Sequence, residues 1–170
     1  MTPALGTAVV SDFDGTLAQL TIPWQSLRET LAVQRIEELW NDADTGRWAV
    51  VTRAEVDAAQ LAPPIAHVFE ALADVTEIAV LSNNDETAIE TFLDRWPPLR
   101  ERVRAVVGRR ALGGPKTDFA NFSAGYARCV AALTPAVAHT ITYIGDMSYE
   151  LGYARRLGAH AFDVKELEAS

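Results

Sequence analysis

Five short runs of residues that favour β-strands are separated by segments with apolar residues at helical spacing, and this alternation constrains the fold most. Each run has the length and composition of a buried strand, and each intervening segment can cover one face of a sheet. Because strands that alternate with helices need crossover connections, they form a mainly parallel sheet with helices on both faces. The sequence therefore predicts a doubly wound α/β fold with five strands. The predicted strands are 7–10, 77–81, 103–107, 140–144 and 160–162, and the helical segments between them include 65–72, 89–96 and 119–133.

Residues 18–62 interrupt the alternation, since they contain helical patterns but no convincing strand. The pair Pro63-Pro64 marks the end of this segment, because proline does not continue a helix. The chain is long enough for one ordinary domain with a small insertion, but hardly for two independent domains. We therefore expect an α/β core domain of residues 1–17 and 63–170 and a helical cap insertion over 18–62.

Two helical patterns lie within the insertion. The first, over residues 24–40, should kink or divide into two short helices, because its apolar positions fall out of phase. The second is predicted over 53–61. Thr52 precedes it and Glu55 follows three residues later, as in a capping box, so Thr52 is the predicted N-cap.

Composition and charge exclude several functional classes. With 49% apolar and 22% charged residues, the chain has the composition of a globular protein and not of a disordered one. The net charge of −8 opposes binding to nucleic acid or to an anionic membrane surface. We expect neither a signal peptide nor a membrane span and read the protein as cytoplasmic, while Cys129 should be a small core residue.

Polar residues with catalytic potential follow the predicted strands. In open parallel sheets the ligand lies beyond the carboxyl ends of the strands, so these residues can converge on one site. Each also has an ordinary structural explanation, because an Asp-Gly pair is a common turn and aspartate, serine and asparagine are common helix caps. The prediction of a shared site therefore rests on the order of these residues along the chain and on their placement at the ends of strands. The residues are Asp12, Asp14, Ser82, Asn83, Lys116, Asp146 and Glu150.

A magnesium site is predicted where the first and fourth strands end. Asp12 and Asp14 are two residues apart, so both project to the same side if the strand extends that far. Two adjacent carboxylates resist ionising together, and Mg²⁺, which prefers oxygen ligands, would relieve their repulsion with Asp146 as a further ligand. Glu150 follows Asp146 by one helical turn and could hold a metal-bound water or orient a ligand.

In this order, the motifs resemble those of the haloacid dehalogenase-like hydrolase superfamily. Nearly the whole chain takes part in the resemblance, and the insertion is similar to the helical cap of phosphoglycolate-phosphatase-like members. The resemblance implies a Rossmann-like core and a Mg²⁺-dependent phosphatase that acts on a small phosphorylated metabolite. The segments that carry it are Asp12-Phe13-Asp14-Gly15-Thr16, Leu81-Ser82-Asn83, Lys116, and Gly145-Asp146 with Glu150.

The resemblance also implies roles for individual residues. Asp12 would be the nucleophile that forms an aspartyl-phosphate, and Asp14 would protonate the leaving group and later activate water. Dehalogenase members lack a carboxylate at the second position, so Asp14 favours phosphate over halide. Mg²⁺ would bridge Asp12, the backbone carbonyl of Asp14 and Asp146, with Glu150 close by. The implied phosphate-binding residues are Thr16, Ser82, Asn83 and Lys116.

Two positions depart from the family pattern. Many members have aspartate where this chain has Glu150, and many follow the catalytic lysine with proline, whereas Lys116 precedes a threonine. In the family role, Lys116 would neutralise charge beside the nucleophile and the phosphate, but a lone lysine is ordinarily a solvated surface residue. Arg109 and Arg110 could supply the cation instead, although a solvated surface is the more ordinary expectation for such a pair.

Other functions fit parts of the pattern. A phosphotransferase of the same superfamily would pass the phosphate to an alcohol instead of water. A receiver-like signalling domain uses similar groups, but its acceptor aspartate follows the third strand, where this chain has Gly108-Arg109. A catalytically quiet phosphoryl-binding scaffold usually lacks one of the essential aspartates, all of which are present here. The identity of the substrate and the oligomeric state stay open at the level of the sequence.

Overall fold

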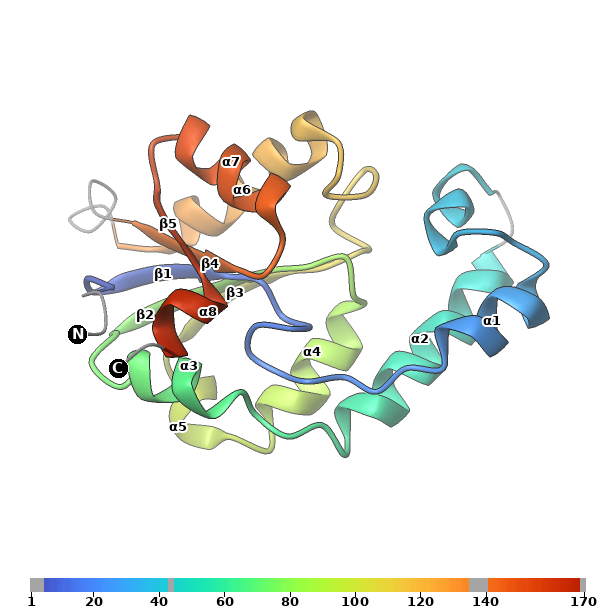
Figure 1. Cartoon of the computed structure of the whole chain (residues 1–170), viewed down its shortest axis with the longest axis horizontal. Helices are drawn as coiled ribbons and strands as arrows, with labels where there is room; N and C mark the ends of the chain where they lie inside the picture. Colours follow the sequence, from blue (N-terminus) through green and yellow to red (C-terminus); the bar gives the residue numbers. More distant parts are fainter. Residues whose placement is uncertain (1–4, 43–44, 135–140, 169–170) are drawn as a thin grey trace.

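Five parallel strands form one sheet in the order β3-β2-β1-β4-β5, in a computed structural model that describes residues 5–42, 45–134 and 141–168 (Figure 1). The predicted five-stranded parallel sheet is confirmed. The predicted fourth strand began at residue 140, which lies outside the described residues, and the observed one begins at Thr142. The strands are β1 (Ala8–Ser11), β2 (Glu77–Leu81), β3 (Val103–Val107), β4 (Thr142–Gly145) and β5 (His160–Asp163).

Helices cover both faces of this sheet, so the doubly wound α/β architecture is confirmed (Figure 1). The central strand shows why, because Val9 packs in one hydrophobic cluster while Ala8 and Val10 pack in the other, as the two-residue period of a strand requires. Cys129 is fully buried in the second cluster, as predicted. One face carries α6 (Phe119–Ala132) and α7 (Ser148–Arg156), and the other carries α3 (Ala66–Ala71), α4 (Glu86–Leu93), α5 (Pro97–Arg100) and α8 (Val164–Glu168).

The helical segment after β1 lies to one side of the sheet (Figure 1). It contains α1 (Trp24–Leu31), the 3₁₀ helix η1 (Ile36–Asn41) and α2 (Thr45–Ala59). The predicted division of residues 24–40 is confirmed, because α1 stops at Ala32, whose φ of 51° is left-handed. A small core of Leu31, Leu39 and Val51 holds these helices together. None of the helices in the described part of the chain is long and apolar enough to span a bilayer.

The chain leaves and rejoins the core at adjacent points. Ala18 and Pro64 form an isolated antiparallel bridge. The amide of Gln19 donates to the carbonyl of Pro63 at 3.1 Å, and the amide of Ile65 donates to that of Leu17 at 3.1 Å. The helical segment is therefore closed at its base by backbone hydrogen bonds, while its extent of 18–62 stays a prediction.

The prediction that Thr52 is the N-cap of a helix beginning at residue 53 is wrong. The helix α2 begins at Thr45, and Thr52 lies within it. Residues 45–51 contain no proline, so the helix continues through Thr52, and the Thr52 hydroxyl accepts a hydrogen bond from Arg109 Nη2 at 2.7 Å instead. Glu55, the other member of the supposed capping box, also binds Arg109.

Candidate active site

Polar side chains from the carboxyl ends of the strands line a cleft of about 580 Å³, and the helical insertion forms its opposite wall. The cleft therefore lies where a parallel sheet is expected to bind its ligand. Of the residues predicted from the sequence, all but Thr16 line it. The predicted residues that line it are Asp12, Asp14, Ser82, Asn83, Lys116, Asp146 and Glu150.

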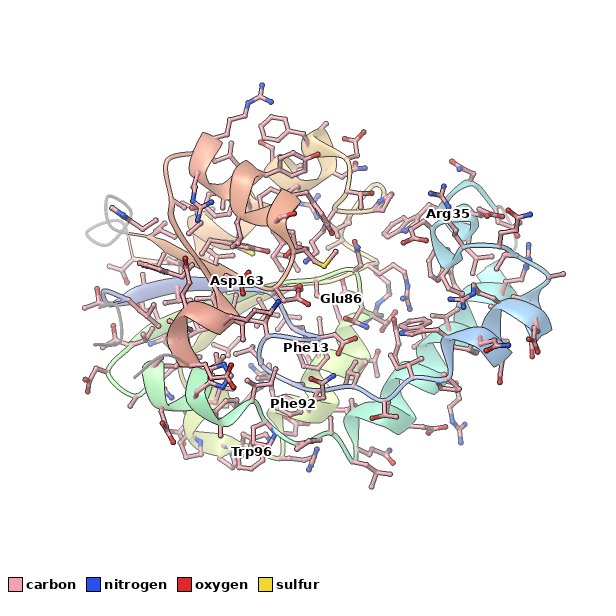
Figure 2. The ribbon with its side chains drawn as sticks, viewed as in Figure 1. Phe13, Arg35, Glu86, Phe92, Trp96 and Asp163 are labelled. Atoms are coloured by element: carbon pink, nitrogen blue, oxygen red, sulfur yellow. The ribbon has the colours of Figure 1, made fainter. Side chains whose placement is uncertain are left out.

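Phe13 explains why Asp12 and Asp14 reach this cleft together. Its ring is fully buried and packs edge-on against Phe92 of α4, with the ring centroids 5.5 Å apart (Figure 2). Because Phe13 turns into the apolar core, the residues before and after it are free to project toward the cleft. The amide of Phe13 also donates to Asp12 Oδ1 at 2.7 Å, which fixes the Asp12 carboxylate.

Lys116 forms the centre of the site. Its side chain is only 2% exposed, so the expectation for a lone lysine, a solvated surface position, does not hold. The ammonium lies 2.8 Å from Asp12 Oδ1 and 2.6 Å from Glu150 Oε1, and it donates to the carbonyl of Leu81 at 3.1 Å. Burial alone would lower the pKa of Lys116, but the two carboxylates outweigh burial and raise it. The lysine is therefore a cation held against Asp12.

Asp14 lies in a different environment from Asp12. Its Oδ1 accepts a hydrogen bond from the amide of Leu20 at 3.0 Å. Burial, reinforced by the charges of Asp12 and Asp146, raises the pKa of Asp14 to about 6, although the hydrogen bond from Leu20 opposes the shift. The site thus contains one carboxylate paired with a cation and a second whose pKa is raised above its ordinary value.

Three carboxylates form a candidate metal site, since oxygen atoms of Asp12, Asp146 and Glu150 all lie within 4.8 Å of one another. Burial and the negative charge of Asp12 both raise the pKa of Asp146. A bound cation would relieve the repulsion between these two carboxylates. The chain approaches Asp146 closely at Gly15, whose φ is 76°, and a Cβ there would lie 2.5 Å from Asp146 Oδ2. This all-oxygen set suits a hard cation such as Mg²⁺.

Glu150 is already committed to protein donors. Its Oε1 accepts from Lys116 and from the hydroxyl of Tyr149 at 3.1 Å, and its Oε2 accepts from the hydroxyl of Tyr143 at 2.8 Å. Burial and the charge of Asp12 raise the pKa of Glu150. Among the three carboxylates, Asp12 and Asp146 therefore fit a cation better, while Glu150 is placed to hold Lys116.

The turn after β2 supplies the predicted phosphate-binding groups. Ser82 is buried, and its hydroxyl donates to Asn84 Oδ1 at 2.9 Å. Asn83 Oδ1 accepts from the amide of Lys116 at 2.9 Å, so this asparagine fixes the lysine loop. Thr16 is fully buried away from the cleft, and its hydroxyl has no hydrogen-bond partner among the residues that the structure describes.

An ion pair between the insertion and the core is the feature that the sequence did not predict. Arg109, expected on the surface, is 5% exposed and donates to both oxygens of Glu55 at 2.8 and 2.9 Å. Its guanidinium also lies 4.3 Å from the ring centroid of Trp48. Asn84 Nδ2 donates to Glu55 Oε1 at 3.1 Å, so the pair connects through Asn84 to Ser82. Arg110 is 64% exposed and pairs with Glu86, as a surface arginine does.

No protein-family model matches the chain, and neither does any curated protein. Solved structures do match along nearly its whole length. A structure named a haloacid dehalogenase-like hydrolase, from Bacteroides fragilis, covers 96% of this chain and 93% of its own, with a TM-score of 0.66 and 19% identity. The chain has the haloacid dehalogenase-like hydrolase fold. The resemblance predicted from the four motifs is thereby confirmed for the fold.

Other structures with the haloacid dehalogenase-like fold carry different names. One from Lactobacillus plantarum, named a phosphoglycolate phosphatase, covers 99% of this chain and 89% of its own, with a TM-score of 0.63 and 13% identity. The L-2-haloacid dehalogenase from Xanthobacter autotrophicus covers 92% of this chain and 76% of its own, with a TM-score of 0.56 and 19% identity. Proteins named as phosphatases and proteins named as dehalogenases thus share this fold. The fold alone therefore does not decide between the two reactions, and the side chains in the cleft must be considered.

Proposed function

We propose that this chain is a Mg²⁺-dependent phosphatase that hydrolyses small phosphomonoesters through an aspartyl-phosphate on Asp12. One observation carries the proposal: Asp12 and Asp14 line the same cleft, with the Lys116 ammonium 2.8 Å from Asp12. This arrangement supplies a carboxylate for attack, a second for proton transfer and a cation for the phosphoryl charge.

In the first step, a carboxylate oxygen of Asp12 attacks phosphorus. Asp12 Oδ1 accepts hydrogen bonds from the amide of Phe13 and from Lys116, whereas Oδ2 accepts none within the described residues and is the oxygen available for attack. The new O–P bond forms as the bond from phosphorus to the leaving oxygen breaks. Asp14 gives its proton to that oxygen, so the products are the aspartyl-phosphate and a neutral alcohol.

In the second step, the carboxylate of Asp14 takes a proton from water, and the water oxygen attacks phosphorus. The bond between Asp12 and phosphorus breaks, which releases inorganic phosphate and restores the Asp12 carboxylate. Asp12, the carbonyl of Asp14 and Asp146 would hold Mg²⁺, which when bound offsets the negative charge gathered in the cleft. The Lys116 ammonium would bind both a phosphoryl oxygen and Asp12 and so orient the two for attack, while its ion pair with Glu150 holds the lysine in position.

Asp14 distinguishes phosphate from halide as the leaving group. A departing halide needs no proton, whereas an alkoxide is a poor leaving group unless an acid protonates it. Asp14 is placed in the cleft with one oxygen held by Leu20, which supports a role in proton transfer. We therefore assign phosphomonoesters, and not haloacids, as the substrates.

The proposal is tested by measuring phosphate release from p-nitrophenyl phosphate and a panel of phosphorylated metabolites with and without MgCl₂. We expect Mg²⁺-dependent release that falls to background in Asp12→Asn, because the amide neither attacks phosphorus efficiently nor forms an aspartyl-phosphate. An acid-stable, hydroxylamine-sensitive phosphorylated protein should be trapped from the wild type only. Halide release from L-2-chloropropionate without any phosphatase activity would overturn the assignment.

A further inference from the structure

The wall of the cleft opposite the carboxylates belongs to the insertion. It contributes aromatic and cationic side chains that the hydrolytic steps do not use. The cleft, at about 580 Å³, falls within the usual range for sites that hold a whole small molecule rather than one phosphate group. This wall consists of Trp24, Arg28, Gln34, Arg35, Ile36, Glu37, Trp40, Trp48 and Glu55, the last of which is paired with Arg109.

Three of the four tryptophans of the chain line the cleft, and the geometry fixes two of them. Trp48 donates from Nε1 to the carbonyl of Leu39 at 3.1 Å and lies under the guanidinium of Arg109. Trp40 packs edge-on against Trp48, with ring centroids 5.4 Å apart at 71°. Tryptophans held in this way form an apolar surface that loses little conformational entropy on binding.

The arginines of the insertion divide into two groups. Arg47 pairs with Asp42, and Arg53 pairs with Asp57. Arg28 and Arg35, which line the cleft, form no ion pair with any residue that the structure describes. Figure 2 shows Arg35 on the insertion. A guanidinium without a carboxylate partner at the rim of a cleft is suited to bind a carboxylate or phosphate of a ligand.

We infer that the substrate is a phosphomonoester whose leaving group has a planar apolar body and a second anionic group, bound by Arg28 and Arg35. This inference rests on the proposed phosphatase function, because that function places the scissile phosphate of the ligand at Asp12. The planar body then lies against Trp24 and Trp40, and the second anion faces the arginines, away from the four carboxylates of the opposite wall. A neutral leaving group gains the apolar contact but not the ionic one.

The test compares four synthetic esters with nearly the same leaving alcohol: benzyl phosphate and its 4-carboxy, 4-carbamoyl and 4-phosphono derivatives. We expect the kcat/KM of the carboxy and phosphono esters to exceed that of the other two by about tenfold, mainly through KM, as for a charged hydrogen bond. The ratio between these two esters shows which anion is preferred. An aliphatic ester with the same carboxylate, 5-carboxypentyl phosphate, should be used less well.

Variants connect this preference to the arginines. In Arg28→Gln and Arg35→Gln, the ratio of kcat/KM between 4-carboxybenzyl and benzyl phosphate should fall toward one. Arg53→Gln is the matched control, since Arg53 is an exposed arginine of the same insertion that pairs with Asp57, and it should keep the full ratio. Equal use of charged and neutral esters, or a preference that survives both cleft variants, would overturn the inference.

A binding measurement separates this inference from the phosphatase proposal. Tryptophan fluorescence is titrated with benzylphosphonate and 4-carboxybenzylphosphonate in MgCl₂, because neither ligand can be hydrolysed. Tighter binding of the carboxylate, lost in Arg28→Gln, would support the inference even if no ester were turned over. Equal affinities would contradict it, while hydrolysis of p-nitrophenyl phosphate alongside would leave the phosphatase proposal standing.

Discussion

At the scale of single residues, the site separates two carboxylates that are two positions apart in the chain. Asp12 is paired with Lys116, and Asp14 is held by the amide of Leu20. The intervening Phe13 produces this separation by filling the core beneath the cleft. One turn thus places two aspartates in different surroundings, Asp12 against a cation and Asp14 with a raised pKa, which suits the roles of a nucleophile and a general acid.

Asp14→Asn tests the assignment of the proton donor. We expect kcat with benzyl phosphate to fall by roughly 10²- to 10⁴-fold, the usual contribution of a general acid. With p-nitrophenyl phosphate the loss should be smaller for the first step, because p-nitrophenolate leaves without protonation. Single-turnover kinetics with both esters measures that step directly. Equal losses for the two leaving groups would argue against Asp14 as the acid.

The shifted pKa of Asp14 also predicts how stability depends on pH in the protein kept free of metal by EDTA. The folded-state pKa, about 6, exceeds the ordinary value of 3.8. Between these values the folded state holds a proton that the unfolded state has released, so the contribution of Asp14 to stability falls as pH rises through that window. Urea unfolding at pH 4 and pH 6.5 should show a smaller decrease in Asp14→Asn than in the wild type. An unchanged decrease would contradict the shift.

At the scale of elements, the insertion is joined to the core by the buried pair of Glu55 on α2 and Arg109 after β3. Arg109 donates to both oxygens of Glu55, stacks on Trp48 and reaches the hydroxyl of Thr52. Removing one partner would leave the other charge buried without compensation. The orientation of α2 against the β2 and β3 loops therefore depends on this pair.

Glu55→Ala or Arg109→Ala should each lower the free energy of unfolding by about 3–5 kcal/mol. The neighbouring pair of Arg110 and Glu86 is a matched control, because Arg110 is 64% exposed, and Arg110→Ala should cost less than about 1 kcal/mol. Urea unfolding followed by circular dichroism measures both. If the two arginine variants lost equal stability, the buried pair would not anchor the insertion.

The elements also show which features were predictable from sequence. The strands and the order of the motifs were predictable because each depends on residues close together in the chain. The start of α2 was not, since the Thr52–Glu55 spacing matches a capping box although the helix runs through it. The burial of Arg109 was not predictable either, because its partner Glu55 lies 54 residues away and no local pattern links them.

At the scale of the whole molecule, the cleft gathers four carboxylates at the strand ends, Asp12, Asp14, Asp146 and Glu150, around the ammonium of Lys116, while the other strand-end cation, Arg109, is paired with Glu55. Three of these carboxylates, Asp14, Asp146 and Glu150, have raised pKa values, chiefly because of burial and also because of repulsion by the charge of Asp12. The fold brings these charges together, and a bound cation would offset them. Stability and metal binding should therefore be linked.

Mg²⁺ should raise the melting temperature of the wild type relative to protein in EDTA, with an increase that grows with metal concentration. Asp146→Asn should reduce this effect strongly, because it removes one of the two carboxylates best placed for the cation. Differential scanning fluorimetry with NaCl at matched ionic strength separates specific binding from screening. A similar increase in Asp146→Asn and wild type would place the cation elsewhere.

The backbone bridge between Ala18 and Pro64 has a consequence for how such a protein can diversify. Because the exit and the re-entry of the chain are hydrogen-bonded neighbours, the sheet places no demand on the length of the segment between them. That segment supplies the tryptophan and arginine wall, while the carboxylates and Lys116 come from outside it. Under the proposed function, recognition and chemistry are therefore encoded in separable stretches of the chain, and one can be exchanged while the other is kept.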